Sequence, residues 1–265
     1  MEKIRISAVS YLNTFPFVYG LKHSGLNTEC EIALDIPSVC AEKLISGKVD
    51  IGLIPVAAIL QVKNANIISN YCIGANGKVK TVCLFSEVPL NEIKTILLDY
   101  QSRTSVLLTK ILAKEYWKIN PEFVNAEEGF EKNIKGNTAG VVIGDRAFSL
   151  TPSSSAQREG SSVLLAYDLA YEWKNFTNLP FVFACWVANK NLPAEFISDF
   201  NSALKNGLDN IDKALEEFPP SVISTAEAKK YLSENISYDF DADKKKALEL
   251  FNQLAEKINT NLSSG

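Results

Sequence analysis

Several patterns that would identify common classes of protein are missing from this sequence. It has a single histidine, His23, which counts against a histidine-based metal site or catalytic triad. No apolar run reaches the roughly 18–20 residues of a membrane-spanning helix, and the glycines and lysine of a nucleotide P-loop are absent. The five cysteines are widely spaced without a CxxC pair, so they predict buried thiols in a reducing compartment.

The charge balance narrows the classes of partner. The 265 residues include 27 basic and 31 acidic side chains, a net charge of −4 that argues against a broad nucleic-acid surface. This net charge is compatible with a small anionic ligand that a few well-placed groups bind. From Met1 the chain runs into a strand-like pattern without a charged-then-apolar leader. We therefore expect a cytoplasmic protein that binds neither membrane nor nucleic acid; its oligomeric state is left open.

The order of predicted elements indicates an α/β fold with two similar halves. Two strand–helix–strand–helix–strand blocks, residues 4–54 and 95–143, flank a β-rich stretch. Such alternation predicts parallel sheets covered by helices. Crossing strands at residues 79–85 and 180–188 would join two lobes as a clamp, and helices after residue 193 would return to the first lobe. Ligands in such sheets bind beyond the carboxyl ends of the strands, which predicts a cleft between the lobes.

Polar side chains follow the first strand of the first block. Ser10, Tyr11, Asn13 and Thr14 stand in five consecutive positions after the strand at residues 4–9. They predict either a ligand-binding turn or an ordinary capped turn, because such residues are common in both. Ser38 is expected to cap the next helix.

The corresponding position in the second block is an anion-site candidate. Ser102, Arg103, Thr104 and Ser105 follow a strand at residues 95–98 and lead into a helix at residues 104–116. Unpaired amides at a helix start, with hydroxyls and a guanidinium, suit a carboxylate or phosphate. The alternative is an N-cap with a solvated arginine.

Four further positions are candidates near the same cleft. Arg146 follows the strand at residues 140–143 and is predicted either to bind a ligand carboxylate or to pair with neighbours. Thr81 and Ser86 lie in the first crossing strand, on opposite faces if it is regular. Pro55 starts a short helix after the strand at residues 49–54, where its backbone would line a site.

Five motifs, in this order, resemble the chorismate dehydratases of the futalosine route to menaquinone. They are SYLNTFP at residues 10–16, DIGLIPV at 50–56, SRTS at 102–105, GDRA at 144–147 and LPFVFACW at 179–186. The resemblance implies a fold like type II periplasmic-binding proteins, with each lobe a mixed sheet flanked by helices and a ligand cleft between the lobes. We expect residues 1–86 and 189–265 in the first lobe and residues 87–188 in the second.

The resemblance also implies a reaction. A lyase of this family removes water from chorismate to give 3-[(1-carboxyvinyl)oxy]benzoate, with no metal or other cofactor. In the family, the asparagine of the YLNT motif is associated with proton transfer, which here is Asn13, and Ser86 is a candidate hydrogen-bonding helper. The expected substrate-binding residues are Ser10, Tyr11, Thr14, Ser38, Pro55, Thr81, Ser102, Arg103, Thr104, Ser105 and Arg146.

Two other functions stay open. One is the sister enzyme of the same pathway, 1,4-dihydroxy-6-naphthoate synthase, whose larger substrate needs a roomier cleft. The other is a cytoplasmic protein that binds a small anion without catalysis, because a fold alone does not establish an activity.

Overall fold

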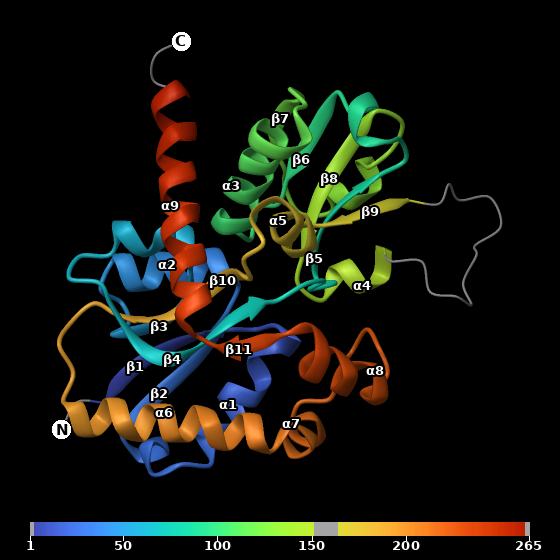
Figure 1. Ribbon diagram of the computed structural model, residues 1–265. Coiled ribbons are helices and arrows are strands. Elements are labelled where there is room, and N and C mark those ends of the chain that lie inside the picture. The colour runs from blue at the N-terminus through green and yellow to red at the C-terminus, as the bar shows by residue number, and fades with distance from the viewer. Residues whose placement is uncertain (1–2, 151–163, 263–265) are drawn as a thin grey trace.

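Two separate β-sheets divide the chain into two lobes in the computed structural model, which describes residues 3–150 and 164–262 (Figure 1). The first sheet has six strands in the order β11-β4-β10-β3-β1-β2. They are β1 (Ile4–Val9), β2 (Cys30–Asp35), β3 (Ile51–Pro55), β4 (Asn66–Ala75), β10 (Phe181–Ala188) and β11 (Ser237–Asp239). The second sheet has the order β7-β6-β8-β5-β9. Its strands are β5 (Val82–Ser86), β6 (Thr95–Leu98), β7 (Glu122–Asn125), β8 (Thr138–Ile143) and β9 (Leu165–Asp168).

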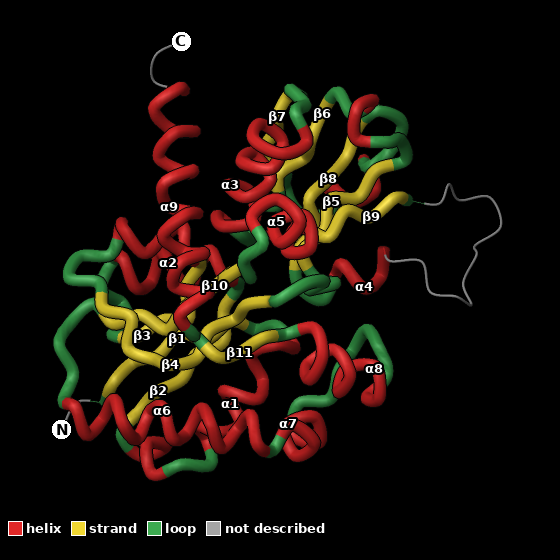
Figure 2. Tube along the Cα trace, viewed as in Figure 1, coloured by secondary structure: helices red, strands yellow, loops and turns green. Residues whose placement is uncertain are grey.

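Both sheets are mixed, and helices cover their faces (Figure 2). The first lobe carries α1 (Phe15–Lys22), α2 (Pro37–Ile45), α6 (Ala194–Asp209), α7 (Ile211–Glu217), α8 (Thr225–Lys230) and α9 (Ala242–Leu262). The second carries α3 (Arg103–Ile111), α4 (Arg146–Leu150) and α5 (Leu169–Thr177). In Figure 1, α1 and α6 lie below the first sheet, and α2 and the start of α9 lie above it. Within the described ranges, no helix is both long enough and apolar enough to cross a bilayer.

Two glycines allow α1 and α6 to pack closely. A Cβ atom on Gly20 would lie 2.0 Å from the carbonyl oxygen of Ala203, and one on Gly207 would lie 1.8 Å from that of Pro16. Any side chain at either position would therefore force the helices apart. This contact fixes α1, which begins just after the predicted YLNT site turn.

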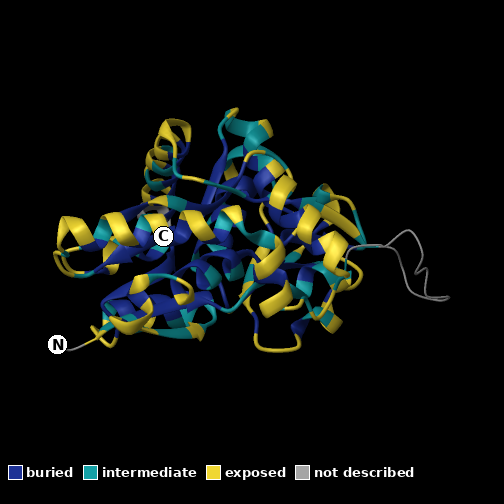
Figure 3. Ribbon diagram, turned by 90° about the horizontal axis from the view of Figure 1, so that it is seen from below, coloured by how far each residue is buried: buried dark blue, intermediate teal, exposed yellow. Residues whose placement is uncertain are grey.

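Buried aromatic rings connect the two lobes. Trp173 of α5 packs edge-on against Phe181 of β10 at 5.2 Å, and Phe181 packs against Phe251 of α9 at 5.4 Å. The indole N–H of Trp173 donates to the carbonyl oxygen of Pro180 at 3.1 Å. Figure 3 shows buried residues running through both lobes, and one continuous apolar core includes residues of both sheets. The junction is therefore a packed hinge region.

The structure confirms the predicted two-lobed α/β fold, but the chain crosses between the lobes earlier than expected. β5 pairs with β8 and β9 and lies entirely in the second sheet, although residues 82–86 were expected in the first lobe. β10 pairs with β3 and β4 and lies entirely in the first sheet, although residues 181–188 were expected in the second lobe. Neither strand is shared, because each forms its hydrogen bonds within one sheet. The crossings fall instead in the segments just before these two strands.

The C-terminal helices return to the first lobe as predicted, and α9 also packs against α3 of the second. The predicted cap of α2 was wrong. Ile36 is the N-cap and Pro37 the first helical residue, with no side-chain capping bond, so Ser38 lies one residue inside the helix. Proline suits that first position because its missing N–H would have no helical partner there.

Candidate functional site

A small cavity lies between the lobes, beside the carboxyl ends of β1 and β3 and the first turn of α3. Its volume is about 50 Å³. Its polar side chains are those of Tyr11, Asn13, Thr81, Ser102 and Ser105. The rest of the lining is Val9, Pro37, Pro55, Ile73, Val79, Val82, Ile143, Gly144, Phe183 and Ala184. Of the described residues that line this cavity, none carries a charge.

Six of the predicted site residues meet in this cavity. They come from segments far apart in the sequence: Tyr11, Asn13, Pro55, Thr81, Ser102 and Ser105. Tyr11 and Asn13 follow β1, Thr81 precedes β5 in a crossing segment, and the two serines stand at the start of α3. Pro55 was expected to start a helix, but it is the last residue of β3 and the N-cap of the 3-10 helix Val56–Gln61. The expectation that strand ends and a helix start gather at one cleft therefore agrees with the position of this cavity.

Asn13 is held at three of its atoms. It lies in a short 3-10 helix, Leu12–Thr14, and is buried with 8% of its surface exposed. Its amide Nδ2 donates to the hydroxyl of Tyr231 at 3.3 Å, and its Oδ1 accepts from the Thr14 hydroxyl at 3.3 Å. Its backbone carbonyl accepts from the hydroxyl of Tyr238 at 3.0 Å. The amide is therefore fixed by residues of the C-terminal segment as well as by its own turn.

The start of α3 has the geometry of an anion site. Ser102 is the N-cap residue, with extended backbone angles, and its Oγ accepts from the backbone N–H of Ser105 at 3.2 Å. The two serine Oγ atoms lie 3.0 Å apart. A first helical turn leaves backbone N–H groups without helical partners, and the helix dipole adds positive potential there. Hydroxyls and N–H groups together can bind a carboxylate without a charged side chain.

Arg146 stabilises this part of the second lobe rather than lining the cavity. Its guanidinium donates to Asp99 and to Glu131, at 2.6 Å in each case, and lies over the ring of Tyr100. Asp99 also accepts from the backbone N–H groups of Gln101 and Ile143, at 2.9 and 3.0 Å. Burial raises the pKa of Asp99, and the positive charge of Arg146 opposes that rise. Of the two predicted roles for Arg146, the geometry matches pairing with neighbours.

Contacts beside the cavity hold the two lobes together. Tyr11 donates to the side-chain oxygen of Gln101, whose backbone oxygen accepts from the N–H of Ser38 at 3.0 Å. The backbone N–H of Leu12 donates to the carboxylate of Asp145 at 3.2 Å. Burial raises the pKa of Asp145 to about 6, because the N–H of Leu12 only partly offsets the loss of solvent.

Gly144 allows the ring of Tyr11 to pack closely against the second lobe. Its φ of +68° lies in the left-handed region, and a Cβ atom there would come within 2.6 Å of the Tyr11 ring. A side chain at this position would therefore strain the backbone and prevent the same lobe contact.

The remaining predicted residues lie outside the cavity lining. Thr14 is buried and bonds to Asn13, and Thr104 donates to the carbonyl oxygen of Phe183 at 3.2 Å. Ser10 lines a different pocket, beside Phe148. Thr14 and Thr104 therefore bond to residues that line the cavity, whereas Ser10 belongs to another pocket.

Arg103 and Ser86 lie farther from the cavity lining. Arg103 of the second lobe donates to Gln61 at 2.8 Å and lies 3.8 Å from Glu42, both in the first lobe. Ser86 ends β5, five residues beyond Thr81 and about 15 Å along an extended strand. Its Oγ accepts from the N–H of Val88 at 3.1 Å. The predicted catalytic role of Ser86 therefore finds no support in its position.

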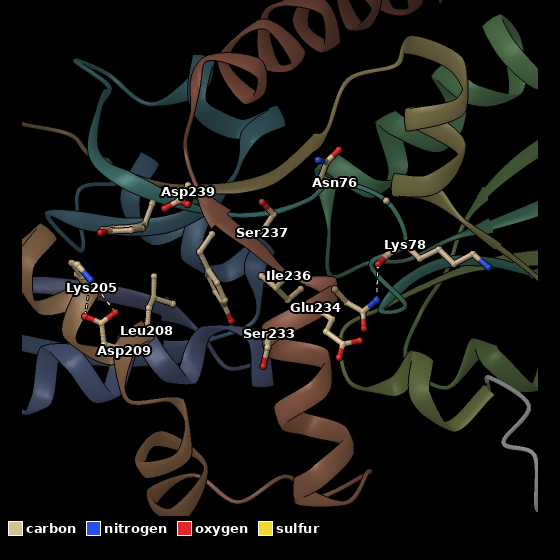
Figure 4. A pocket seen from close by; sticks show the side chains of 14 residues that line it. Asn76, Lys78, Lys205, Leu208, Asp209, Ser233, Glu234, Ile236, Ser237 and Asp239 are labelled. Atoms are coloured by element: carbon tan, nitrogen blue, oxygen red, sulfur yellow. Dashed lines mark hydrogen bonds and ion pairs between the residues drawn. The ribbon is translucent and has the colours of Figure 1, made fainter.

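A much larger pocket lies elsewhere among the described residues and contains none of the predicted residues. Its volume is about 650 Å³, and Figure 4 shows it around β11 and the segment that precedes it. Lys205 and Asp209, both on α6, form an ion pair at one side of this pocket. The amide of Asn235 donates to the carbonyl oxygen of Lys78 at 2.9 Å. Size alone therefore does not identify the site.

Sequence reasoning missed four residues that shape the cavity. Tyr231 and Tyr238 of the C-terminal segment bond to Asn13 without lining the cavity themselves, and Gln101 and Asp145 connect the lobes beside it. The two tyrosines lie in the C-terminal stretch after residue 193, for which the sequence predicted helices that return to the first lobe and no site residue. Their hydroxyls bond to a residue more than 200 positions earlier, and no local spacing signals such a contact.

Comparison with known proteins agrees with the fold and identifies the family. A chorismate dehydratase from Thermus thermophilus is 26% identical over 219 residues, which cover 78% of each chain. Protein AF1704 from Archaeoglobus fulgidus has a similar structure, with a TM-score of 0.73 and 16% identity over 97% of this chain and 98% of that one. The periplasmic aliphatic sulphonate binding protein SsuA from Escherichia coli has a TM-score of 0.60 and 15% identity over 98% and 93%. These likenesses confirm the periplasmic-binding-protein-like fold. The profile of the family described as menaquinone biosynthesis matches residues 4–257, and the chain belongs to that family.

Proposed function

We propose that this protein is a chorismate dehydratase, a hydro-lyase that converts chorismate to 3-[(1-carboxyvinyl)oxy]benzoate and water in the cytoplasm. The observation that carries the proposal is that Asn13 and the start of α3 line one cavity from opposite lobes. Membership of the menaquinone-biosynthesis family and the similarity to a chorismate dehydratase support the same assignment.

The polar groups of the cavity suit a compact dianion. One carboxylate would bind at the first turn of α3, where Ser102 and Ser105 supply hydroxyls beside backbone N–H groups. The other would bind on the first-lobe side, near Tyr11, Asn13 and Thr81. Uncharged donors can serve because each carboxylate exchanges water for fixed hydrogen bonds. The apolar remainder of the lining matches the faces of the carbocyclic ring.

The reaction needs little acid–base catalysis by the protein. The ring carbon that carries the ether oxygen loses its hydrogen as a proton, and the adjacent carbon loses its hydroxyl. The C–H electron pair forms the double bond that completes the aromatic ring, and the proton and hydroxyl leave as water. A neutral amide is a weak base, so Asn13 acts by orienting the substrate and by hydrogen bonding during the elimination.

Turnover requires the lobes to separate. A cavity of about 50 Å³ is much smaller than the roughly 300–1,000 Å³ of typical ligand pockets, so this conformation is a closed one. Opening would break the contacts of Tyr11 with Gln101, of Leu12 with Asp145 and of Ser38 with Gln101. Each such hydrogen bond contributes a net of about 0.5–1.5 kcal/mol. Opening would also separate Arg103 from Gln61 and Phe148 from the Tyr231 ring.

The test is incubation of the purified protein with chorismate alone. We expect a new aromatic absorbance and a product lighter than chorismate by one water, measured by mass spectrometry. Asn13→Ala is the control for a contaminating activity. Chorismate that stays bound but unconverted would instead identify a small-anion binding protein. Conversion of a cyclic futalosine derivative, with chorismate untouched, would identify 1,4-dihydroxy-6-naphthoate synthase.

A further inference from the structure

We propose that Tyr231 is a positioning residue that fixes the orientation of the Asn13 amide, so that Oδ1 is the amide atom presented to the substrate. This inference rests on the proposed function and adds a residue from the C-terminal segment to its machinery. Tyr231 follows α8 at the start of a π-helical turn, Tyr231–Asn235, and only 2% of its surface is exposed.

The hydroxyl of Tyr231 lies between the two polar side chains of the first-lobe side of the cavity. It is 3.3 Å from Nδ2 of Asn13 and 2.7 Å from the hydroxyl oxygen of Thr81. Phe148 of the second lobe packs edge-on against the Tyr231 ring at 5.1 Å. The ring is therefore fixed, and its oxygen cannot leave this position without a void in the packing.

The direction of these hydrogen bonds determines which amide atom is left for the substrate. An amide nitrogen can only donate, so Nδ2 of Asn13 donates to the oxygen of Tyr231. The hydroxyl hydrogen of Tyr231 is then available to Thr81. Burial raises the pKa of Tyr231 above its ordinary value, so the group stays a hydroxyl. One Nδ2 hydrogen is engaged by Tyr231, and Oδ1 accepts from the Thr14 hydroxyl at 3.3 Å, which leaves its second lone pair to accept a hydrogen bond from a reacting group.

The contacts of Asn13 divide between two tyrosines. Tyr238 bonds to its backbone oxygen and so locates the turn, whereas Tyr231 bonds to the side-chain amide. Loss of the Tyr231 hydroxyl would leave Asn13 in place, but its side-chain amide would keep only the contact of Oδ1 with the Thr14 hydroxyl and would rotate more easily about its last torsion. Such rotation would lower the rate of the chemical step and leave substrate binding nearly intact.

The experiment compares Tyr231→Phe with wild type. Phenylalanine keeps the ring and its contact with Phe148 and removes only the hydroxyl. We expect kcat for chorismate to fall roughly tenfold, the equivalent of one hydrogen bond, with KM within about twofold. Tyr116→Phe is the matched control, because Tyr116 packs on Phe176 in the second lobe and is absent from the cavity lining. The control variant should keep the kcat of wild type.

A spectroscopic readout tests the same contact without substrate. The side-chain NH₂ signals of Asn13 in the ¹⁵N-labelled protein are assigned by their loss in Asn13→Ala. In Tyr231→Phe we expect these signals to shift and to exchange faster with water, and in Tyr116→Phe to stay unchanged. Unaltered signals in Tyr231→Phe would overturn the proposal, whatever happens to the rate. A shifted signal with wild-type kcat would also overturn it.

Thr81→Val provides an independent variant, because it removes the other partner of the Tyr231 hydroxyl. If both residues act on Asn13 through one series of hydrogen bonds, the double variant with Tyr231→Phe should lose no more kcat than Tyr231→Phe alone. Multiplied losses would contradict a shared role. If wild type does not convert chorismate, the proposed function fails, and the NMR comparison still decides whether Tyr231 orients Asn13.

Discussion

The two sides of the cavity are stabilised in different ways. On the second-lobe side, the start of α3 is organised locally: Ser102 caps Ser105, three residues later. On the first-lobe side, Asn13 depends on Tyr231 and Tyr238, which follow it by 218 and 225 residues. The first arrangement can form as soon as a helix turn forms, whereas the second requires the completed first lobe. We infer that the α3 side of the cavity is robust to distant changes and that the Asn13 side is sensitive to them.

The strongest test of this contrast is Asn13→Ala. We expect kcat for chorismate to fall about 10²-fold or more, the loss seen when one preorganised hydrogen-bonding group is removed from a reacting centre. Far-UV circular dichroism should be unchanged, because Tyr231 keeps its bond to Thr81. Steady-state kinetics decides the matter, and turnover at the wild-type rate would remove Asn13 from the mechanism.

The local and distant contacts also explain how far the sequence could predict the site. The Ser102–Ser105 turn combines residues whose types and spacing already specify a helix cap, so its position could be predicted. Tyr231 and Asp145 could not be assigned in the same way, because their partners are set by how the finished lobes pack. Arg103 shows the converse error: a basic residue at a predicted anion site lies outside the cavity lining, on the opposite lobe's Gln61 and Glu42.

The fold was predictable for the same physical reason. Alternation of apolar strands and amphipathic helices follows from local periodicity, and it correctly indicated two α/β lobes. The boundary between the lobes was not predictable to the residue. Whether β5 and β10 are shared between sheets or belong to one depends on hydrogen bonds to strands distant in the sequence.

Asp145 gives a second test, because it joins the first-lobe turn from the opposite lobe. Its pKa in the folded protein, about 6, lies above the usual value of 3.8, so the folded state binds more protons than the unfolded chain between about pH 4 and 6. Stability should therefore decrease as pH rises through this window. The expected decrease is about 2 kcal/mol, less than the full value of the shift because the carboxylate keeps some solvent contact.

Asp145→Asn is the matched variant for this pH dependence. The asparagine cannot ionise, and its Oδ1 can still accept from the N–H of Leu12. Denaturant unfolding at several pH values should show the contribution of Asp145 as the difference between wild type and Asp145→Asn. That difference should grow in favour of the variant from pH 4 to 7. A constant difference would mean that Asp145 keeps an ordinary pKa.

Ser102→Ala probes the locally organised side. Loss of the cap should cost about 1 kcal/mol of stability and raise KM for chorismate severalfold, with a smaller effect on kcat. Ser102→Thr retains a capping oxygen and should recover most of the stability. Chemical denaturation and steady-state kinetics measure the two effects. If Ser102→Ala lowered kcat as strongly as Asn13→Ala and left KM unchanged, the division of labour between the two sides would be wrong.

The smallest expected effect is that of Arg103→Ala. Arg103 belongs to the SRTS motif, yet its guanidinium reaches Gln61 and Glu42 of the first lobe and does not line the cavity. Exposed ion pairs contribute about 0–1 kcal/mol, so stability and KM for chorismate should stay close to wild type. Side-by-side kinetics with Ser102→Ala sharpens the comparison, because the residues are adjacent in sequence but differ in what they contact. A tenfold rise in KM for Arg103→Ala would show that the arginine turns inward when substrate binds, and that the anion site depends on charge after all.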